Sequence, residues 1–436
     1  MKNFSVVVFL CILLYVCTIS CENQENSSNR QVYNPSRRVT LSSFHPQEGR
    51  IAEKMLLDGD NFGSDPSIIR VYFNDKPASV LSSTGGRIYA LCPRMPGDEC
   101  VISVVVGNDS VVYDEKFTYH VSVSVSTVAG NGIETFRAGN LADAQLRPSH
   151  LTVDNENNIF VALRQNVPQR GLARINEGEN VMIPLLLDGT LITPNALCVD
   201  RNTGIIYIPC ESGREIFYTM DPREGWAPRR RSFTWRNLNG NALPSNSWKH
   251  SMGFCYLEGY EGIYTRFFDG QIVRIDPRTY EADIISMSPN GTCVGVTFHP
   301  LRPELLYIAG RSGGMSQGIY VFDVRNPDDP PRRLNPAGRG HRDGDISVAL
   351  FDNPWQIYFD PYGYLYIADA DNHCIRRMRP DNFVETVVGI PGTAGWRDGG
   401  RDEALFDAPM GVGVDKDGTV YVADWNNNRI RKLAME

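Results

Sequence analysis

A chain of 436 residues is long enough to bury two hydrophobic cores. Its formal net charge is −8, and Arg229, Arg230 and Arg231 form its one dense basic cluster, which a solvated loop explains. Because binding to nucleic-acid phosphates requires a larger set of clustered Lys and Arg, this composition argues against nucleic acid as a partner.

The N-terminus has the pattern of an export signal. Lys2 precedes an apolar stretch from Phe4 to Val16, which has the length of a signal peptide and is short for a membrane span. No later segment is apolar for long enough to cross a bilayer. We therefore predict that residues 1–20 are removed on export.

The end of this stretch, Thr18-Ile19-Ser20-Cys21, resembles a bacterial lipobox. The resemblance implies cleavage before Cys21 and acylation of its thiol, so that the lipid is the only membrane attachment. Residues 21–37 are polar and acidic, and we expect a flexible tether there. Plain secretion with cleavage near Ser20 is the alternative.

Apart from Cys21, the exported chain has seven cysteines, and an odd number excludes complete pairing in a monomer. Cys92 and Cys100 flank a turn and are candidates for a disulfide across a hairpin, or for two free thiols. The other five lie in apolar strand contexts and are expected to pack as small buried side chains: Cys198, Cys210, Cys255, Cys293 and Cys374. No CxxC pair suggests zinc, and we expect no metal or other cofactor.

Residues 38–122 alternate short apolar segments with turns rich in Gly, Asp, Asn and Pro, a pattern typical of a β-sandwich. The segments 44–49 and 58–63, followed by Val71-Tyr72-Phe73-Asn74, resemble the turn motifs of the IPT/TIG domain, an immunoglobulin-like family. The resemblance implies a rigid spacer without chemistry of its own.

Residues 123–436 contain an internal repeat. The segment 349–376 and the segment 404–430 share an Ala-Leu-Phe-Asp-x-Pro start, an Asp-x-x-Gly turn and a Tyr-[Ile/Val]-Ala-Asp strand end, and they resemble the NHL repeat. Weaker copies begin near Pro148, Pro194, Met252 and Val294, which makes six units. A single unit cannot bury both its faces, so the repeat predicts a six-bladed β-propeller.

The ends of this region predict how the ring closes. Residues 126–132 and 142–148 parallel residues 385–389 and 403–409, so an outer strand precedes the first unit. The last unit ends at Glu436 without that strand. We therefore predict an all-β chain in which an N-terminal IPT/TIG sandwich is followed by a six-bladed NHL-type propeller closed by its N-terminal strand.

In a propeller, the loops that enter the first strands and the loops that follow the second strands lie on one face, around the channel mouth. Arginine binds carboxylates in two-point fashion, and indole stacks on the apolar face of a sugar. A solvated network of arginines with acidic side chains is the alternative. The candidate ligand-binding residues at this mouth are His150, Arg164, Asn195, Glu211, His250, Arg266, Arg311, Trp355, Gln356 and Trp425.

Catalysis has weaker support in the sequence, and we identify no catalytic residue. Related propellers include metal-dependent lactonases and lyases, which need several Asp, Glu, Asn or His ligands that converge. Here the corresponding positions include Val294, Trp355 and Met410, and no HExxH, GxSxG or paired-acid motif is present. A lyase or hydrolase acting on a glycan or lactone remains an alternative.

The order of lipobox, IPT/TIG domain and NHL propeller resembles the auxiliary nutrient-binding lipoproteins of gut Bacteroidetes. This resemblance implies a non-catalytic carbohydrate-binding protein on the outer membrane, facing the cell surface, with an oligo- or polysaccharide at the propeller mouth. Outer-membrane importer components are the implied protein partners. A protein-interaction scaffold without a small ligand is a further alternative.

Overall fold

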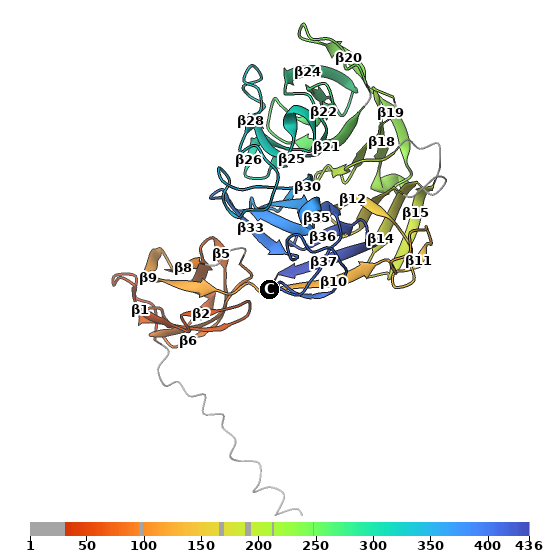
Figure 1. Cartoon of the computed structure of the whole chain (residues 1–436). Helices are drawn as coiled ribbons and strands as arrows, with labels where there is room; N and C mark the ends of the chain where they lie inside the picture. The colour runs from red at the N-terminus through yellow and green to blue at the C-terminus, as the bar shows by residue number, and fades with distance from the viewer. Residues whose placement is uncertain are drawn as a thin grey trace, which may run out of the picture. The chain divides into compact units, whose positions relative to one another are not determined.

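The computed structural model describes residues 31–95, 99–164, 170–187, 193–211, 213–246 and 248–435. These residues fall into two compact units, one that ends at Val121 and one that runs from Ser122 to Met435. The regular elements described are strands and four short 3-10 helices, so the predicted all-β class is confirmed (Figure 1). The lipobox and most of the tether lie outside the described residues.

The first unit consists of two sheets with the strand orders β1-β3-β7-β6 and β2-β9-β8-β4-β5. Its elements are β1 (Thr40–His45), β2 (Glu48–Gly49), β3 (Lys54–Asp60), η1 (Pro66–Ile68), β4 (Ile69–Phe73), β5 (Lys76–Pro77), β6 (Ser79–Ser83), β7 (Arg87–Leu91), β8 (Glu99–Val106) and β9 (Asp109–Tyr119). Alternate residues of β8 are buried, because successive side chains of a strand point to opposite faces. The two sheets therefore enclose a single core.

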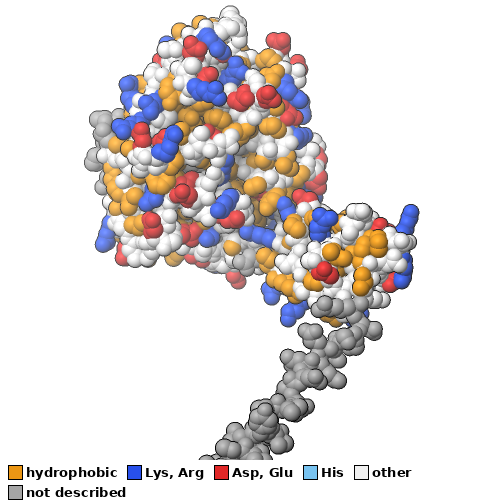
Figure 2. All heavy atoms as spheres, turned by 180° about the vertical axis from the view of Figure 1, so that it is seen from behind, with side chains coloured by type: hydrophobic (Ala, Val, Ile, Leu, Met, Phe, Trp, Pro, Cys, Tyr) orange, Lys and Arg blue, Asp and Glu red, His pale blue; other side chains and the backbone are white. Residues whose placement is uncertain are grey.

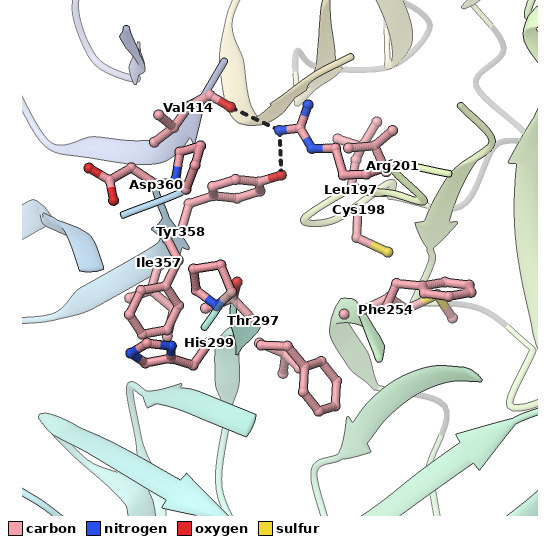
Figure 3. A pocket seen from close by; sticks show the side chains of 18 of the residues that line it. Leu197, Cys198, Arg201, Phe254, Thr297, His299, Ile357, Tyr358, Asp360 and Val414 are labelled. Carbon is pink, nitrogen blue, oxygen red and sulfur yellow. Dashed lines mark hydrogen bonds between the residues drawn. The ribbon is translucent and has the colours of Figure 1, made fainter. Parts of the chain in front are cut away.

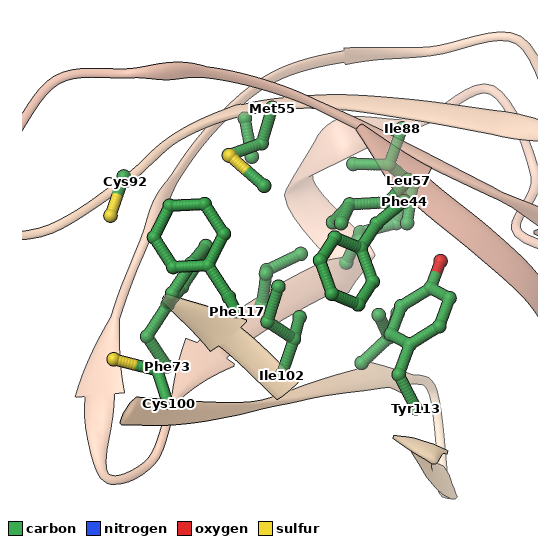
Figure 4. Close-up of a cluster of buried hydrophobic side chains, with 14 of the residues drawn as sticks. Phe44, Met55, Leu57, Phe73, Ile88, Cys92, Cys100, Ile102, Tyr113 and Phe117 are labelled. Carbon is green, nitrogen blue, oxygen red and sulfur yellow. The ribbon is translucent and has the colours of Figure 1, made fainter. Parts of the chain in front are cut away.

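Aromatic rings fill the centre of this core (Figure 4). The rings of Phe44 and Tyr113 meet edge to face with centroids 5.2 Å apart, and those of Phe73 and Phe117 do so at 5.3 Å. Edge-to-face contacts of this kind stabilise the core beyond simple burial. No polar cluster interrupts the buried face among the residues described, which fits a structural role.

Cys92 and Cys100 do not face each other across a hairpin. Cys92 follows β7 of one sheet and Cys100 lies in β8 of the other, and these strands do not pair. Both residues are buried. Burial, together with the nearby Cys100, raises the pKa of Cys92 to about 12, so the thiol stays protonated at neutral pH.

The second unit contains six sheets in the part of the chain described. Their innermost strands are β12 (Pro148–Val153), β16 (Cys198–Val199), β21 (Lys249–Cys255), β25 (Cys293–His299), β30 (Pro354–Phe359) and β35 (Pro409–Val414). The second strands are β13 (Ile159–Leu163), β17 (Ile206–Pro209), β22 (Gly262–Phe267), β26 (Arg302–Gly310), β31 (Leu365–Asp369) and β36 (Val420–Asp424). Adjacent strands of each inner pair run antiparallel, as in a hairpin.

The outer strands complete these sheets. The third strands are β14 (Gly171–Asn176), β18 (Ile216–Met220), β23 (Gln271–Ile275), β27 (Gly318–Asp323), β32 (Cys374–Met378) and β37 (Arg429–Met435). The fourth are β15 (Val181–Leu187), β19 (Arg229–Ser232), β24 (Glu281–Met287), β28 (Arg332–Arg333), β33 (Phe383–Val388) and β10 (Val123–Ala129). Short edge strands and 3-10 turns are β11 (Gly139–Asn140), β20 (Thr234–Asn237), β29 (Gly344–Asp345), β34 (Gly399–Gly400), η2 (Pro222–Glu224), η3 (Gly313–Met315) and η4 (Ala370–Asn372).

The first strand of this unit lies in its last sheet. β10 pairs antiparallel with β37, and the register joins Val123 to Met435 and Thr127 to Arg431. Each innermost strand also lies against the innermost strand of the next sheet, and β35 of the last sheet lies against β12 of the first. The outer strand that precedes the first repeat thus belongs to the final sheet, where it lies between β37 and the two-residue strand β34.

Close approach of innermost strands depends on glycine at a few positions. A Cβ at Gly413 of β35 would come within 2.5 Å of the Leu151 side chain, and one at Gly411 within 3.0 Å of the His150 backbone. Any larger residue there would push β35 away from β12. The glycines therefore set how closely β35 and β12 approach each other.

Each of the last two sheets contains a buried arginine that holds its own segments together. Arg431 is fully buried and donates to Asp424 (2.8 Å), to Asp398 (2.6 Å) and to the backbone carbonyls of Leu405 and Arg397. Arg376 makes the equivalent contacts in the preceding sheet. The Asp at the end of each Tyr-[Ile/Val]-Ala-Asp segment is thus a structural partner of a buried guanidinium.

The surface carries charges of both signs. On the face shown in Figure 2, Lys and Arg alternate with Asp and Glu across the second unit without a continuous basic stripe. Within the described ranges, no helix has the length and apolarity that a membrane crossing would require.

The buried ion pair of Arg431 generates the first prediction. We expect Arg431→Met to lower the free energy of unfolding of the second unit by about 3–5 kcal/mol, because it leaves Asp424 buried without its cation. The exposed pair of Arg379 and Asp381 supplies a control, and Arg379→Met is expected to cost less than about 1 kcal/mol. Urea denaturation measures both, and equal losses would contradict the prediction.

Candidate functional site

Seven of the ten candidate residues lie together where the innermost strands begin and the second strands end. We call them the strand-start cluster: His150, Arg164, Asn195, Glu211, His250, Arg311 and Trp355. His150, His250 and Trp355 come from β12, β21 and β30, whereas Arg164, Glu211 and Arg311 follow β13, β17 and β26. The prediction that these two sets of positions meet is therefore consistent with the contacts described below.

Glu211 joins three members of this cluster. Arg164 forms an ion pair with its carboxylate and also donates to Asn195 Oδ1 (3.2 Å), while His250 Nε2 lies 3.5 Å from Glu211 Oε1. Burial raises the pKa of Glu211. The hydrogen bond from His250 and the charge of Arg164 together lower it by more, so the pKa lies below its ordinary value. Glu211 is therefore a fixed carboxylate that orients its neighbours.

His150 presents a hydrogen-bond acceptor inside this cluster. The hydroxyl of Ser149 donates to the carbonyl of Ala162 (3.2 Å), so it accepts from His150 Nδ1 (3.1 Å). Burial and the positive charge of Arg164 hold the pKa of His150 well below its usual value, and the ring stays neutral. With the proton on Nδ1, Nε2 carries a lone pair.

Trp355 lies between an imidazole and a guanidinium. Its ring centroid is 5.6 Å from that of His150, and the Arg311 guanidinium carbon lies 4.5 Å from the centre of the indole. Arg311 is held in this place by Asn353 Oδ1, which accepts from its Nε at 2.9 Å. Burial lowers the pKa of Arg311, and burial, together with the charges of Arg170 and Arg311, lowers that of Arg164 against the opposing charge of Glu211.

Four buried polar atoms of the cluster have no hydrogen-bond partner among the described residues: His150 Nε2, Arg164 Nε, Asn195 Nδ2 and Trp355 Nε1. His150 is fully buried and Trp355 is 3% exposed. A buried polar atom without a partner costs about 1–3 kcal/mol, so a hydrogen bond to any of these atoms would be favourable. One acceptor and three donors in one cluster fit hydroxyl groups, which both donate and accept.

The other three candidates have different surroundings. Arg266 donates to Ser288 and to the carbonyls of Pro289 and Gly291, so it holds that loop. The amide of Gln356 accepts from Leu151 N (3.1 Å) and donates to Leu151 O (2.7 Å). The guanidinium of Arg147 lies 4.2 Å from the centre of the Trp425 ring.

Sequence reasoning missed Lys249, which adjoins His250 in β21. Its ammonium donates to the carbonyls of Cys210 (3.3 Å) and Gly213 (3.0 Å), and burial lowers its pKa to about 8. Arg170, the other omission, reaches Thr193 Oγ1 at 2.9 Å and lowers the pKa of Arg164 through its charge. Lys249 could have been found in the sequence from its position at the start of an innermost strand.

A cavity of about 430 Å³ lies at the opposite ends of the innermost strands. We call it the strand-end cavity, and Figure 3 shows side chains from β25 and β30 and from the segments around Cys198 and Phe254 turned toward it. Its walls are mainly apolar and include Leu197, Met252, Phe254, Val296, Ile357 and Phe359. The sequence offered no signal for this cavity, because its walls look like ordinary core residues.

No group of three or more His, Cys, Asp or Glu side chains in the described segments is arranged to hold a metal ion. His250 and Glu211 are engaged with each other and with Arg164. The strand-start cluster offers hydrogen-bonding atoms and the cationic side chains of Arg164 and Arg311.

Comparison with family models identifies both kinds of domain. Residues 40–119 match the IPT/TIG domain and residues 406–433 match the NHL repeat. The chain contains an IPT/TIG domain and an NHL repeat. Both resemblances found in the sequence are thereby confirmed.

Two curated relatives match parts of the chain. Protein SUPPRESSOR OF QUENCHING 1, chloroplastic, of Arabidopsis thaliana is 33% identical over 188 residues, which make up 40% of this chain and 16% of that protein. NHL repeat-containing protein 2 of Gallus gallus is 31% identical over 105 residues, 22% of this chain and 14% of that protein. The chain thus spans less than a fifth of the length of either relative.

Two solved structures are similar over 93% of this chain and 100% of their own. A structural genomics protein of unknown function from Bacteroides thetaiotaomicron has a TM-score of 0.76 and 23% identity. An auxiliary nutrient binding protein from Bacteroides ovatus has a TM-score of 0.60 and 21% identity. At these identities the likeness establishes the shared fold.

His299 at the strand-end cavity generates a prediction about pH. Its Nδ1 accepts from the amides of Leu301 (3.1 Å) and Arg302 (3.2 Å), and burial, followed by the charge of Arg302, lowers its pKa to about 4 despite the opposing charge of Glu304. In the unfolded chain the pKa returns to about 6.5. Stability from neutral His299 is therefore full above pH 6.5 and is lost as the pH falls toward 4.

We expect the wild-type protein to lose about 1–2 kcal/mol through this group between pH 7 and pH 4.5, allowing for its partial contact with solvent. His299→Asn keeps a side-chain acceptor for the following amides but does not titrate. Its free energy of unfolding should fall correspondingly less over that range. Urea denaturation at both pH values measures the difference, and identical losses would show that His299 does not contribute.

Proposed function

We propose that this chain is a non-catalytic nutrient-binding protein that takes a hydroxyl-rich ligand, an oligo- or polysaccharide, at the strand-start cluster. The observation that carries the proposal is the set of unpaired buried atoms, His150 Nε2, Arg164 Nε, Asn195 Nδ2 and Trp355 Nε1. Sugar hydroxyls donate to the first and accept from the other three. The cationic side chains of Arg164 and Arg311 add affinity for acidic sugars.

The structural neighbours support the same class of function. The Bacteroides ovatus protein with the shared fold is named an auxiliary nutrient binding protein, and so is a second one from Bacteroides thetaiotaomicron with a TM-score of 0.60. With the lipobox at Cys21, this favours an exported protein anchored by lipid to the outer membrane, where importer components are its partners. The IPT/TIG domain serves as a spacer at residues 38–122.

The site requires that the six sheets of residues 123–436 form a closed six-bladed propeller. Its support is the pairing of β10 with β37 and the succession of neighbouring innermost strands that returns from β35 to β12. Closure brings His150 of the first sheet beside Trp355 of the fifth. An open arc would place these side chains on separate surfaces.

Binding tests the function directly. We expect a polysaccharide identified on a glycan array to bind the wild-type protein, and Trp355→Phe to raise its Kd about tenfold, because the variant keeps an aromatic ring and loses the Nε1 donor. Trp425→Phe is the matched control, since Trp425 contacts Arg147 and should leave Kd unchanged. Absence of binding to every glycan, or equal effects of both variants, would overturn the proposal.

Closure has a separate test. Ser124 of β10 faces Ala434 of β37, so the pair Ser124→Cys and Ala434→Cys should form a disulfide under oxidising conditions, detected as a linked peptide by mass spectrometry. The control pair is Ser124→Cys with Lys432→Cys, which is two residues out of register and too far apart for a bridge, about 7–8 Å between Cα atoms. Linkage in the control but not in the paired variant would refute this closure.

A further inference from the structure

The strand-end cavity is separate from the strand-start cluster. Its walls come from the far ends of the innermost strands, including Val199, Phe254, His299, Phe359 and Val414, with Gln356 at its inner side. A volume of about 430 Å³ lies within the range of small-molecule sites, about 300–1,000 Å³. It is thus a second place where a ligand of modest size fits.

Apolar and aromatic side chains make up most of this wall. Phe254 and Tyr256 lie with ring centroids 4.9 Å apart, and His299 lies 4.8 Å from Phe359. Each Å² of apolar ligand surface buried here contributes about 25 cal/mol. The ligand therefore has an apolar body, preferably one with a flat face that packs against the rings.

Arg201 places a positive charge at this cavity. Its guanidinium donates through Nη2 to Tyr358 Oη (3.0 Å) and to Val414 O (3.0 Å), the two bonds drawn in Figure 3, and through Nη1 to Asn155 Oδ1 (3.2 Å). All three acceptors are uncharged. Among the described residues no carboxylate lies in an ion pair with Arg201, and two of its five N–H donors remain unused.

The neighbouring carboxylates of Asp200 and Asp154 accept hydrogen bonds from other groups. Asp200 accepts from Asn202 N, Thr203 Oγ1 and Tyr256 Oη, and Asp154 accepts from two turn amides and from Asn158 Nδ2. They offset part of the charge of Arg201 without forming hydrogen bonds to it. The arrangement holds a guanidinium in a fixed orientation and leaves part of its donor capacity available.

The remaining charges at the cavity fit the same pattern. Lys416 is a second cation in its lining. One carboxylate oxygen of Asp415 accepts from the amides of Asp417 (2.9 Å) and Thr419 (2.8 Å). Asp360 likewise accepts from Tyr362 N and Tyr364 N. Two cations and two carboxylates therefore line the cavity, and both carboxylates accept from amides of their own turns.

We propose that the strand-end cavity binds a second ligand, a small organic carboxylate with an apolar, aromatic body, whose carboxylate is held by Arg201. The walls bury the body, and the unused N–H groups of Arg201 donate to the carboxylate oxygens. The site differs in chemistry from the strand-start cluster, which selects hydroxyl groups. Its occupation does not depend on the proposed glycan ligand.

Calorimetric titration of the whole exported chain with 1-naphthoate tests this proposal, with 1-naphthylmethanol as the uncharged probe of similar shape. We expect 1-naphthoate to bind at least fivefold more tightly than the alcohol. Arg201→Gln should remove that difference, while Arg278→Gln, in an exposed turn, should retain it. Thr297→Phe, which fills the cavity, should abolish binding of both probes.

Thermal unfolding establishes that each variant is folded, and Thr297→Phe tests the cavity even where Arg201→Gln fails to fold, because Thr297 makes none of the contacts of Arg201. Trp355→Phe should leave 1-naphthoate binding unchanged, which separates this result from a failure of glycan binding. Equal affinity for the two probes, binding that survives Thr297→Phe, or no binding of 1-naphthoate would overturn the proposal.

Discussion

The pairing of β10 with β37 is the contact on which the second unit depends, because it joins two segments about 300 residues apart in the chain. Without it, β37 would present an unpaired edge, and the last sheet would lack its outer strand. The last sheet also supplies β35, whose glycines let β12 approach closely. That approach brings His150 within reach of Trp355, so a backbone pairing at the outer rim supports side-chain contacts at the channel.

Repetition made most of this architecture predictable from the sequence. The Asp-x-x-Gly turn can be recognised in the sequence because its Asp carboxylate accepts hydrogen bonds from two backbone amides, as Asp415 does. The Asp of the strand end proved to be a partner of a buried guanidinium, as Asp424 is of Arg431. Such local requirements recur in each copy and leave a pattern.

The partner of a polar side chain is harder to predict, because it depends on contacts distant in the chain. Nothing in the sequence around Arg266 shows that the carbonyls of Pro289 and Gly291 will occupy its guanidinium. The same holds for Gln356, whose amide reaches Leu151, 205 residues away. The strand-end cavity was unpredictable for a related reason: its volume arises from differences in side-chain size among the innermost strands.

Gln356 lies between the strand-start cluster and the strand-end cavity. It adjoins Trp355 of the strand-start cluster in β30, yet its own side chain lies at the strand-end cavity and is bonded at both ends to Leu151 of β12. Two hydrogen bonds from one amide thus fix the position of β30 relative to β12. The same strand, β30, supplies Trp355 to the strand-start cluster and Ile357 and Phe359 to the strand-end cavity, so this bridge positions residues of both.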